Sequence, residues 1–236
     1  MKQALDLILG QTSALDSLSD QSRSLLKRAL HPIVLRKNDT LFCSYAEVDG
    51  CYLIESGALK VSMLDHVGAE IWLAIVGAGD WVGELGLIDR NPRSATVTSM
   101  TESRLWRLST RDFDALREAD FEFYHCMVRL VCGRLRATNQ QISDQRLGVQ
   151  ARLAQSMLKL AKAFGDTLSG GMIVIRYKID QSNLAEISGA SREQVNRQFR
   201  AWKDAGLCEI VNGFYCLKKI QKWESLGGRL PPTNTG

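Results

Sequence analysis

The sequence has no apolar run near the roughly 20 residues that a membrane-spanning helix requires. Its six cysteines form no C-x-x-C pair and no close cluster with histidine, which disfavours a zinc site. The three histidines, His31, His66 and His125, are too far apart for the ligand set of a metal-dependent dioxygenase. No serine or cysteine lies beside a recognisable base. These absences predict that the chain is not an enzyme and holds no metal or prosthetic group.

The N-terminus, Met1–Gly10, carries Asp6 inside a short apolar stretch and shows no cleavage-site pattern, so we expect no signal peptide. A cytoplasmic protein with free thiols and no membrane partner follows from that expectation. With 45% hydrophobic and 24% charged residues and no low-complexity stretch, the chain has the composition of an ordinary folded protein. Its 236 residues suffice for one large domain or two of usual size.

Seven of the 19 glycines fall between Gly50 and Gly86, where they separate short runs rich in β-branched, leucine and aromatic residues. The runs with strand character are Cys51–Ile54, Ala58–Leu64, Ile71–Val76, Trp81–Val82, Ala95–Met100 and Arg104–Leu108. This spacing predicts an antiparallel sandwich or barrel. Leu59, Val61 and Met63 occupy alternate positions of the second run, which predicts a largely half-buried strand.

Helical patterns lie on both sides of these runs. Ser19–Leu30 predicts a helix with Ser19 as its N-cap. From Thr110 to Leu147 there is no proline and only one glycine. In this stretch a heptad pattern is formed by Tyr124, Val128, Val131, Leu135, Thr138 and Ile142.

That heptad pattern predicts a helix packed along a partner helix, but a helix lying on the core of its own domain fits the pattern equally well. Thr138 is the polar member, and such positions often set the register or touch something polar. We expect Gly148 to mark the end of the long helix and the boundary between two domains.

Beyond Gly148 the pattern predicts a helix over Val149–Phe164, a loop with three glycines and a short β-like run at Met172–Ile175. The residues that this helix should bury are Leu153, Met157, Leu160 and Ala161.

The segment Asp180–Gly206 predicts two helices joined by a tight turn. The first helix covers Gln181–Ser188 with Leu184, Ala185 and Ile187 inward, Gly189 supplies the turn, and Ser191 and Gln194 form a capping box. The second helix should bury Val195, Phe199 and Trp202. Asn212-Gly213 then joins Cys208–Val211 to Phe214–Leu217 as a hairpin, in a register that pairs Cys216 with Glu209 and Cys208 with Leu217. Together these features predict a winged helix-turn-helix.

The second helix of such a domain enters the major groove of DNA with its N-terminal residues first. The candidate DNA-binding residues are Ser191, Arg192, Glu193, Gln194, Asn196 and Arg197, with Arg200 on the same side. An arginine fork fits guanine O6 and N7, and a glutamate accepts from cytosine N4. The alternative is a solvated charged face on a winged helix that binds protein.

A glycine-rich segment, Gly79–Leu87, precedes Arg93-Ser94-Ala95 in the N-terminal half. Glycines around a short helical turn let backbone N–H groups approach an anion, and an arginine fork suits a phosphate. An ionised glutamate, here Glu84, accepts from a sugar hydroxyl. The pattern predicts a ribose-phosphate site, while a Glu84–Arg93 salt bridge inside a structural loop fits it equally well.

Gly83–Leu87 and Arg93–Ala95 resemble the phosphate-binding cassette of cyclic-nucleotide-binding domains. The run Ser191-Arg192-Glu193 with Arg197 resembles the recognition helix of the Crp/Fnr family of bacterial transcription regulators. The resemblance covers nearly the whole chain and implies an α+β protein. It comprises a jelly-roll β-roll domain at 1–120, a dimerisation helix at 121–147, a winged helix-turn-helix at 148–225 and a flexible tail at 226–236.

The resemblance also implies residue roles. Gly83 and Leu85 lend backbone contacts, Glu84 takes the ribose 2′-hydroxyl, and Arg93 and Ser94 hold the cyclic phosphate of cyclic AMP. The run Arg134–Asn139 resembles the segment of the long helix where a Thr-Ser pair meets the purine. Thr138 matches that pair, but Asn139 replaces the serine, which leaves cyclic GMP open as a ligand.

The implied partners are a second copy of the chain through the Tyr124–Ile142 seam, palindromic DNA with TGTGA-like half-sites, and RNA polymerase. A regulator of the same fold that senses a gas through haem, senses another nucleotide or acts without ligand is the alternative. The distribution of charge supports a separate DNA-binding domain, because the formal net charge is −2 for residues 1–147 and +6 for residues 148–236. The small domain therefore carries the basic surface that DNA binding requires.

Overall fold

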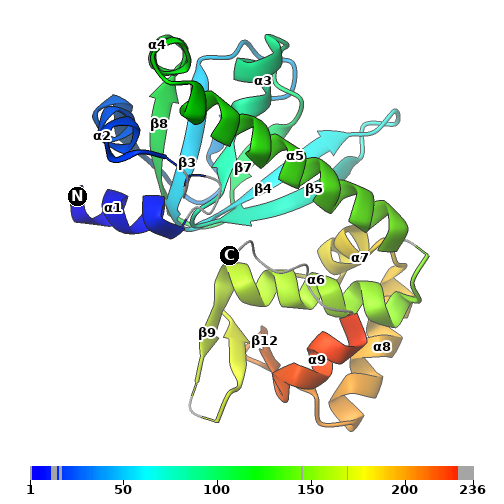
Figure 1. The fold of residues 1–236 in the computed structure, drawn as a ribbon. Coiled ribbons are helices and arrows are strands. Elements are labelled where there is room, and N and C mark those ends of the chain that lie inside the picture. Colours follow the sequence, from blue (N-terminus) through cyan, green and yellow to red (C-terminus); the bar gives the residue numbers. More distant parts are fainter. Residues whose placement is uncertain (1, 12–14, 16–17, 145, 169, 228–236) are drawn as a thin grey trace. The chain divides into compact units, whose positions relative to one another are not determined.

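The computed structural model describes residues 2–11, 15, 18–144, 146–168 and 170–227. The chain divides between Arg136 and Ala137 into two compact units, which we call the N-terminal unit and the C-terminal unit. The helix α5 (Phe121–Asp144) runs through this boundary. Figure 1 shows the elements of each unit.

The N-terminal unit contains two four-stranded antiparallel sheets, as the glycine-separated runs predict. One sheet has the order β1-β8-β3-β6 and the other β2-β7-β4-β5. The strands are β1 (Leu30–Leu35), β2 (Thr40–Phe42), β3 (Gly50–Ser56), β4 (Ala58–Leu64), β5 (Glu70–Gly77), β6 (Trp81–Val82), β7 (Thr96–Ser99) and β8 (Ser103–Ser109). The sequence interpretation lacked β1 and β2. β1 contains Pro32, a residue that sheets tolerate mainly at an edge, and β1 is an edge strand.

The sheet that contains β3 has a core on each face. One apolar cluster joins β3 and β8 to the helices α1 (Lys2–Gln11), α2 (Asp20–Ala29), α4 (Thr110–Ala119) and α5. The other cluster lies between the sheets and includes Ile54, Leu59 and Val97. Because both faces are covered, Cys51–Ile54 is apolar at every position and does not alternate.

The predicted alternation along β4 is correct only for its first half. Leu59 is buried, but Ser62 is 1% exposed and Met63 is 37% exposed, opposite to the prediction. The pairing of β4 with β5 shifts register between Val61 and Ser62. The extra residue is Leu73, so the bulge lies on β5, and the buried hydroxyl of Ser62 donates to Oε1 of Glu70 on that strand at 2.7 Å.

The stretch from Thr110 to Leu147 forms two helices and not one, because the chain leaves helical geometry at Asp120 between α4 and α5. α2 begins after the predicted N-cap Ser19, whose hydroxyl accepts from the backbone N–H of Ser22 at 3.1 Å. Gly148 was expected to end the long helix. It is the N-cap of α6 (Val149–Phe164) instead, since α5 ends at Asp144. No helix within the described ranges is long and apolar enough to cross a membrane.

The C-terminal unit is a winged helix-turn-helix on α6, whose predicted inward residues are all buried. Its elements are β9 (Gly165–Thr167), β10 (Ile173–Ile175), α7 (Gln181–Ser188), α8 (Arg192–Asp204), β11 (Cys208–Val211), β12 (Phe214–Leu217) and α9 (Ile220–Gly227). The hairpin has the predicted register, with Glu209 opposite Cys216. The predicted loop after α6 begins as strand β9, which pairs with β10.

The predicted flexible tail at 226–236 is wrong at its start, because α9 runs through Gly227; residues 228–236 lie outside the described residues. Trp223 of α9 is fully buried, and its indole N–H donates to the carbonyl oxygens of Leu207 and Lys218 at 3.2 and 3.1 Å. α9 thus packs against the residues that flank the β11–β12 hairpin. Sequence patterning did not predict this helix. All six cysteines are free thiols.

Candidate functional site

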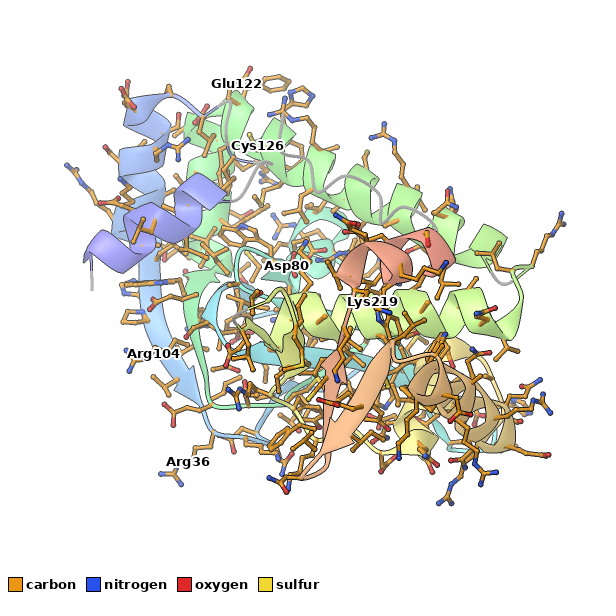
Figure 2. The ribbon with its side chains drawn as sticks, turned by 90° about the horizontal axis from the view of Figure 1, so that it is seen from below. Arg36, Asp80, Arg104, Glu122, Cys126 and Lys219 are labelled. Carbon is orange, nitrogen blue, oxygen red and sulfur yellow. The ribbon has the colours of Figure 1, made fainter. Side chains whose placement is uncertain are left out.

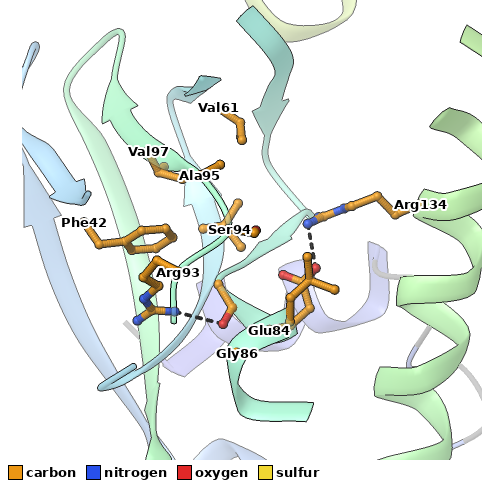
Figure 3. A pocket seen from close by; sticks show the side chains of 12 residues that line it. Phe42, Val61, Glu84, Gly86, Arg93, Ser94, Ala95, Val97 and Arg134 are labelled. Carbon is orange, nitrogen blue, oxygen red and sulfur yellow. Dashed lines mark hydrogen bonds and ion pairs between the residues drawn. The ribbon is translucent and has the colours of Figure 1, made fainter. Parts of the chain in front are cut away.

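A small cavity lies in the N-terminal unit at the start of α3 (Glu84–Asp89), and Figure 3 shows it from close by. It encloses about 40 Å³, which is room for a water molecule or two. The lining residues are Phe42, Val61, Val82, Gly83, Glu84, Leu85, Gly86, Arg93, Ser94, Ala95, Val97 and Arg134. All five pocket residues predicted from the glycine-rich segment and Arg93-Ser94 are therefore brought together at one cavity.

Gly83 precedes α3 in the left-handed region, with φ at +82°. A Cβ built at this position would collide with Nη1 of Arg93. Any other residue would therefore strain the backbone and displace the guanidinium. Glycine at 83 permits the close approach of the backbone to Arg93 on which the pocket depends.

The side chain of Arg93 is buried, at 2% exposure for the residue, and its guanidinium lies 4.1 Å above the ring of Phe42. Nη1 donates to the carbonyl oxygen of Gly83 at 2.9 Å, and Nη2 donates to Oδ1 of Asp49 at 2.6 Å. Nε is buried without a partner among the described residues. A buried cation with an unused donor beside a cavity is suited to an anion.

Glu84 is completely buried, and Oε1 accepts from Nη1 of Arg134 at 2.6 Å. Nη2 of Arg134 donates to the carbonyl oxygen of Trp81 at 2.5 Å. Burial raises the pKa of the Glu84 carboxyl, and the charge of Arg134 offsets part of that rise. The other oxygen, Oε2, has no partner within the described part of the chain, so Glu84 retains an unused acceptor. Figure 3 shows Arg134 reaching Glu84 from α5.

The structure decides against the salt bridge between Glu84 and Arg93 that the sequence left open. Each residue has its own partner, Arg134 for Glu84 and Asp49 for Arg93. Asp49 also accepts from the hydroxyl of Tyr52 at 3.0 Å on each oxygen, and it forms an ion pair with Nη2 of Arg107 at 3.1 Å. Burial, followed by the charge of Asp49, raises the pKa of Tyr52 to about 12.

Three contributors to the pocket were not assigned from sequence. Arg134 belongs to the run Arg134–Asn139, which the family resemblance puts near the purine. The resemblance therefore marked the segment that contains Arg134, but not the role of this residue. Asp49 and Phe42 precede the start of the glycine-rich segment by 30 and 37 residues, and no local pattern marks them. Thr138 and Asn139 are exposed on α5 within the C-terminal unit, so their contact with a purine stays a prediction.

The second candidate site is the N-terminal half of α8. The capping box has formed as predicted, with Ser191 accepting from the backbone N–H of Gln194 at 3.2 Å and its own N–H donating to Oε1 of Gln194 at 2.8 Å. Arg192, Glu193 and Arg197 are exposed. The structure thus commits Ser191 and Gln194 to the helix start and leaves the charged side chains at the surface, while Asn196 is half-buried.

The opposite face of α8 is held by aromatic packing. Val195, Phe199 and Trp202 are buried as predicted. The ring centroids of Phe199 and Tyr215 are 4.8 Å apart, and those of Trp202 and Trp223 are 4.5 Å apart. This packing fixes which face of α8 is exposed. Three or more potential metal ligands do not cluster anywhere in the described ranges.

Comparisons with known proteins match the two domains that contain these candidate sites. The cyclic nucleotide-binding domain family matches residues 32–120, and the Crp-like helix-turn-helix domain family matches residues 151–226. A "CRP-like cAMP-activated global transcriptional regulator" of Mycobacterium tuberculosis is 33% identical over 197 residues, covering 82% of this chain and 86% of the relative. The "cAMP-activated global transcriptional regulator CRP" of Haemophilus influenzae is 30% identical and covers 71% and 75% of the two chains.

Solved structures show the same fold. FixK2 from Bradyrhizobium japonicum has a TM-score of 0.71 at 14% identity and covers 86% of this chain and 99% of its own. The regulator CLP of Xanthomonas campestris, described as c-di-GMP responsive, has a TM-score of 0.68 at 19% identity, with 85% and 99% covered. From the two domain matches and the relatives at 30% identity or more, the chain belongs to the Crp family of cyclic-nucleotide-binding, DNA-binding transcription regulators.

Proposed function

We propose that the chain is a dimeric regulator that binds 3′,5′-cyclic AMP in the Arg93–Glu84 cavity and then binds palindromic DNA through α8. One observation carries the ligand proposal. Arg93 and Glu84, a cation and an acid both buried at one cavity, each retain one unpartnered polar atom among the described contacts. Buried polar atoms without partners cost free energy, so such a pair is suited to a ligand with both an anionic group and a hydroxyl.

Cyclic AMP supplies both groups, because its phosphodiester can accept from Arg93 and a ribose hydroxyl can donate to Glu84. The relatives named for cyclic-AMP activation support this choice of nucleotide. The cavity of about 40 Å³ is too small for a nucleotide. Binding therefore requires side chains to move, and Arg134, which is half-buried and reaches in from a separate element, is the side chain we expect to move.

Pairing through α5 is supported by which of its residues are exposed. The helix packs Phe123, Cys126 and Met127 into the core of the N-terminal unit, where all three are fully buried. The heptad seam starts at this core, since Tyr124 packs against it, but its later members Leu135 and Ile142 are 60% and 59% exposed. The first turns of α5 thus serve the N-terminal unit, and the exposed later part of the seam is available for a second copy.

DNA binding is supported by the exposed Arg192, Glu193 and Arg197 on a helix whose other face is anchored by aromatic rings. Arg192 and Arg197 can each form two parallel bonds to guanine, and Glu193 can accept from cytosine. Two such helices in a symmetric dimer require a palindromic site with half-sites about one helical turn apart. The TGTGA-like half-site and the contact with RNA polymerase come from the family resemblance.

The deciding experiment titrates the full-length protein with cyclic AMP, cyclic GMP and cyclic di-GMP by calorimetry. Each titration is done with and without a duplex that carries a TGTGA palindrome. Cyclic di-GMP is included because of the ligand in the description of CLP. We expect cyclic AMP to bind and to raise affinity for the palindrome over random duplex. Absence of binding by cyclic AMP, or binding that leaves DNA affinity unchanged, would contradict the proposal.

A further inference from the structure

The carboxylate of Asp49 occupies one side of the Arg93 guanidinium, on the residue that the proposed function assigns to the phosphate. Oδ1 of Asp49 lies 2.6 Å from Nη2 of Arg93. The guanidinium is almost fully buried, whereas the side chain of Asp49 is 54% exposed. The positive charge at the end of the cavity is therefore neutralised before any ligand enters.

The second cation at the cavity is also paired with a carboxylate. Arg134 is paired with the carboxylate of Glu84, so the two cations and two carboxylates around the cavity cancel in formal charge. Arg107 also contacts Asp49, at 3.1 Å, and its side chain is 38% exposed, the same fraction as that of Arg134, so it adds a third, partly screened cation. The set therefore has at most one positive charge in excess, which favours a ligand with a single negative charge, since each further charge on the ligand meets Asp49 without a new cation to balance it.

Asp49 is also held in place. The hydroxyl of Tyr52 donates to it at 3.0 Å, and Arg107 donates to the backbone carbonyl oxygen of Asp49 at 2.9 Å. Asp49 can therefore stay beside Arg93 while a phosphate accepts from the unpartnered Nε. A carboxylate so fixed acts on the ligand as a constant negative charge.

We propose that Asp49 is a specificity-determining residue, which makes the Arg93 site selective for a monoanionic phosphodiester over a dianionic phosphate monoester. A cyclic nucleotide is a phosphodiester with one charge, and the 5′-nucleotide formed by its hydrolysis is a monoester with nearly two charges well above its second pKa of about 6. The inference rests on the proposed function, because it assumes that Arg93 receives the phosphate. It adds an electrostatic reason why the site would bind the hydrolysed nucleotide more weakly than the cyclic one.

The test separates charge from ring closure. Binding to the full-length protein is measured at pH 8 for 5′-AMP and for its 5′-methyl phosphate ester, both acyclic, of which only the ester is a monoanion. Cyclic AMP is the reference ligand. We expect the wild-type protein to prefer the methyl ester to 5′-AMP, and D49N to reduce that preference by about three- to tenfold, a modest figure because Asp49 is half-exposed.

A ratio of affinities is the readout because any misplacement of Arg93 in D49N weakens both acyclic ligands and cancels. E47Q is the matched control, since Glu47 is an exposed acid two residues away, and it should leave the ratio unchanged. D49S repeats the test with a smaller neutral side chain. An unchanged ratio in both variants would overturn the role of Asp49. Failure of cyclic AMP to bind the wild-type protein would instead overturn the proposed function.

Discussion

Nη1 of Arg134 on α5 lies 2.6 Å from Oε1 of Glu84, a carboxyl group with no exposure to solvent. The arginine side chain is 38% exposed, so this ion pair joins a buried acid to a partly solvated base. Removal of the base would leave a buried carboxylate uncompensated, which is the costly way to break such a pair.

The first prediction concerns this ion pair. We expect R134M to lower the free energy of unfolding by about 1–3 kcal/mol at pH 7.5, the upper limit being discounted for the exposure of Arg134. Burial already raises the pKa of Glu84 above its ordinary value of 4.5, and loss of Arg134 raises it further. A raised pKa of an acid means that the folded state gains stability as pH falls through that pKa, because the carboxyl takes up a proton more readily folded than unfolded.

The deficit of R134M relative to wild type should therefore shrink as the pH is lowered toward 4.5. Urea unfolding at several pH values measures it, with hydrogen exchange in α3 and β6 reporting on the N-terminal unit. In an E84Q background the same R134M substitution should cost little at any pH. A deficit that stays constant with pH would show that the effect of Arg134 is packing alone.

The pocket shows where sequence patterning succeeds and where it stops. Gly83, Glu84 and Arg93 are close in sequence, and their chemistry could be predicted from spacing and resemblance. The partners of the two charged residues are far away, with 50 residues between Glu84 and Arg134 and 44 between Asp49 and Arg93. Such pairings depend on sheet order and on the path of α5, which no local pattern encodes.

In the fold, too, local features were predicted and features that depend on distant contacts were not. The register of the β11–β12 hairpin and the bounds of α6 and α7 follow from turn residues and helical periodicity, and both were predicted correctly. The exposure of Ser62 and Met63 departs from the predicted alternation where a bulge of β5 shifts the pairing of the two strands, and no local pattern of β4 encodes that pairing. α7, also eight residues long, is framed by Asp180 and Gly189, whereas α9 is positioned by the contacts of Trp223, which no local pattern encodes.

The second prediction concerns the proposed phosphate residue. R93L should weaken binding of cyclic AMP by at least about 100-fold, because a buried charge-assisted contact is lost, and should abolish the nucleotide-dependent increase in DNA affinity. Calorimetry and fluorescence anisotropy measure the two quantities. The matched control is R104L, since Arg104 is an exposed arginine on β8 (Figure 2). Unchanged affinity for cyclic AMP in folded R93L would show that Arg93 does not bind the phosphate.

The third prediction concerns base recognition by α8. R192A should weaken binding to the palindromic duplex by about 5- to 150-fold, the range given by loss of one good base contact of about 1–3 kcal/mol. Affinity for cyclic AMP should stay close to that of wild type. K222A, which removes a positive charge from an exposed position on α9, should affect specific and random duplexes equally. If R192A also affects the two duplexes equally, then Arg192 does not recognise a base.

The fourth prediction concerns Arg152 of α6, which donates to three backbone carbonyl oxygens. Nε and Nη2 reach those of Ser188 and Gly189 at 2.8 Å each, and Nη1 reaches that of Leu147 at 2.7 Å. The guanidinium thus ties the turn between α7 and α8 to the segment before α6. We expect R152M to destabilise the C-terminal unit by about 1–3 kcal/mol and to weaken specific DNA binding, because charged hydrogen bonds are lost and the turn loosens.

Urea unfolding and anisotropy measure both effects of R152M. R152K, which keeps the charge without the planar fork, should recover only part of the stability. K162M changes an exposed lysine on the same helix and should be close to neutral. Full recovery by R152K would show that charge, and not the geometry of the fork, holds the turn.

The fifth prediction concerns the exposed seam of α5. Leu135 is 60% exposed in the single chain, at a position where a heptad contact would bury it in a dimer. L135E places a charge at that contact and should convert the protein to a monomer at micromolar concentration, as measured by analytical ultracentrifugation. Specific DNA binding should fall steeply, because one half-site offers only half of the contacts of a palindrome. L7E, at a leucine on α1 that is 69% exposed, should leave the dimer intact. A wild-type protein that is monomeric, or an L135E variant that remains dimeric, would place the interface elsewhere or exclude it.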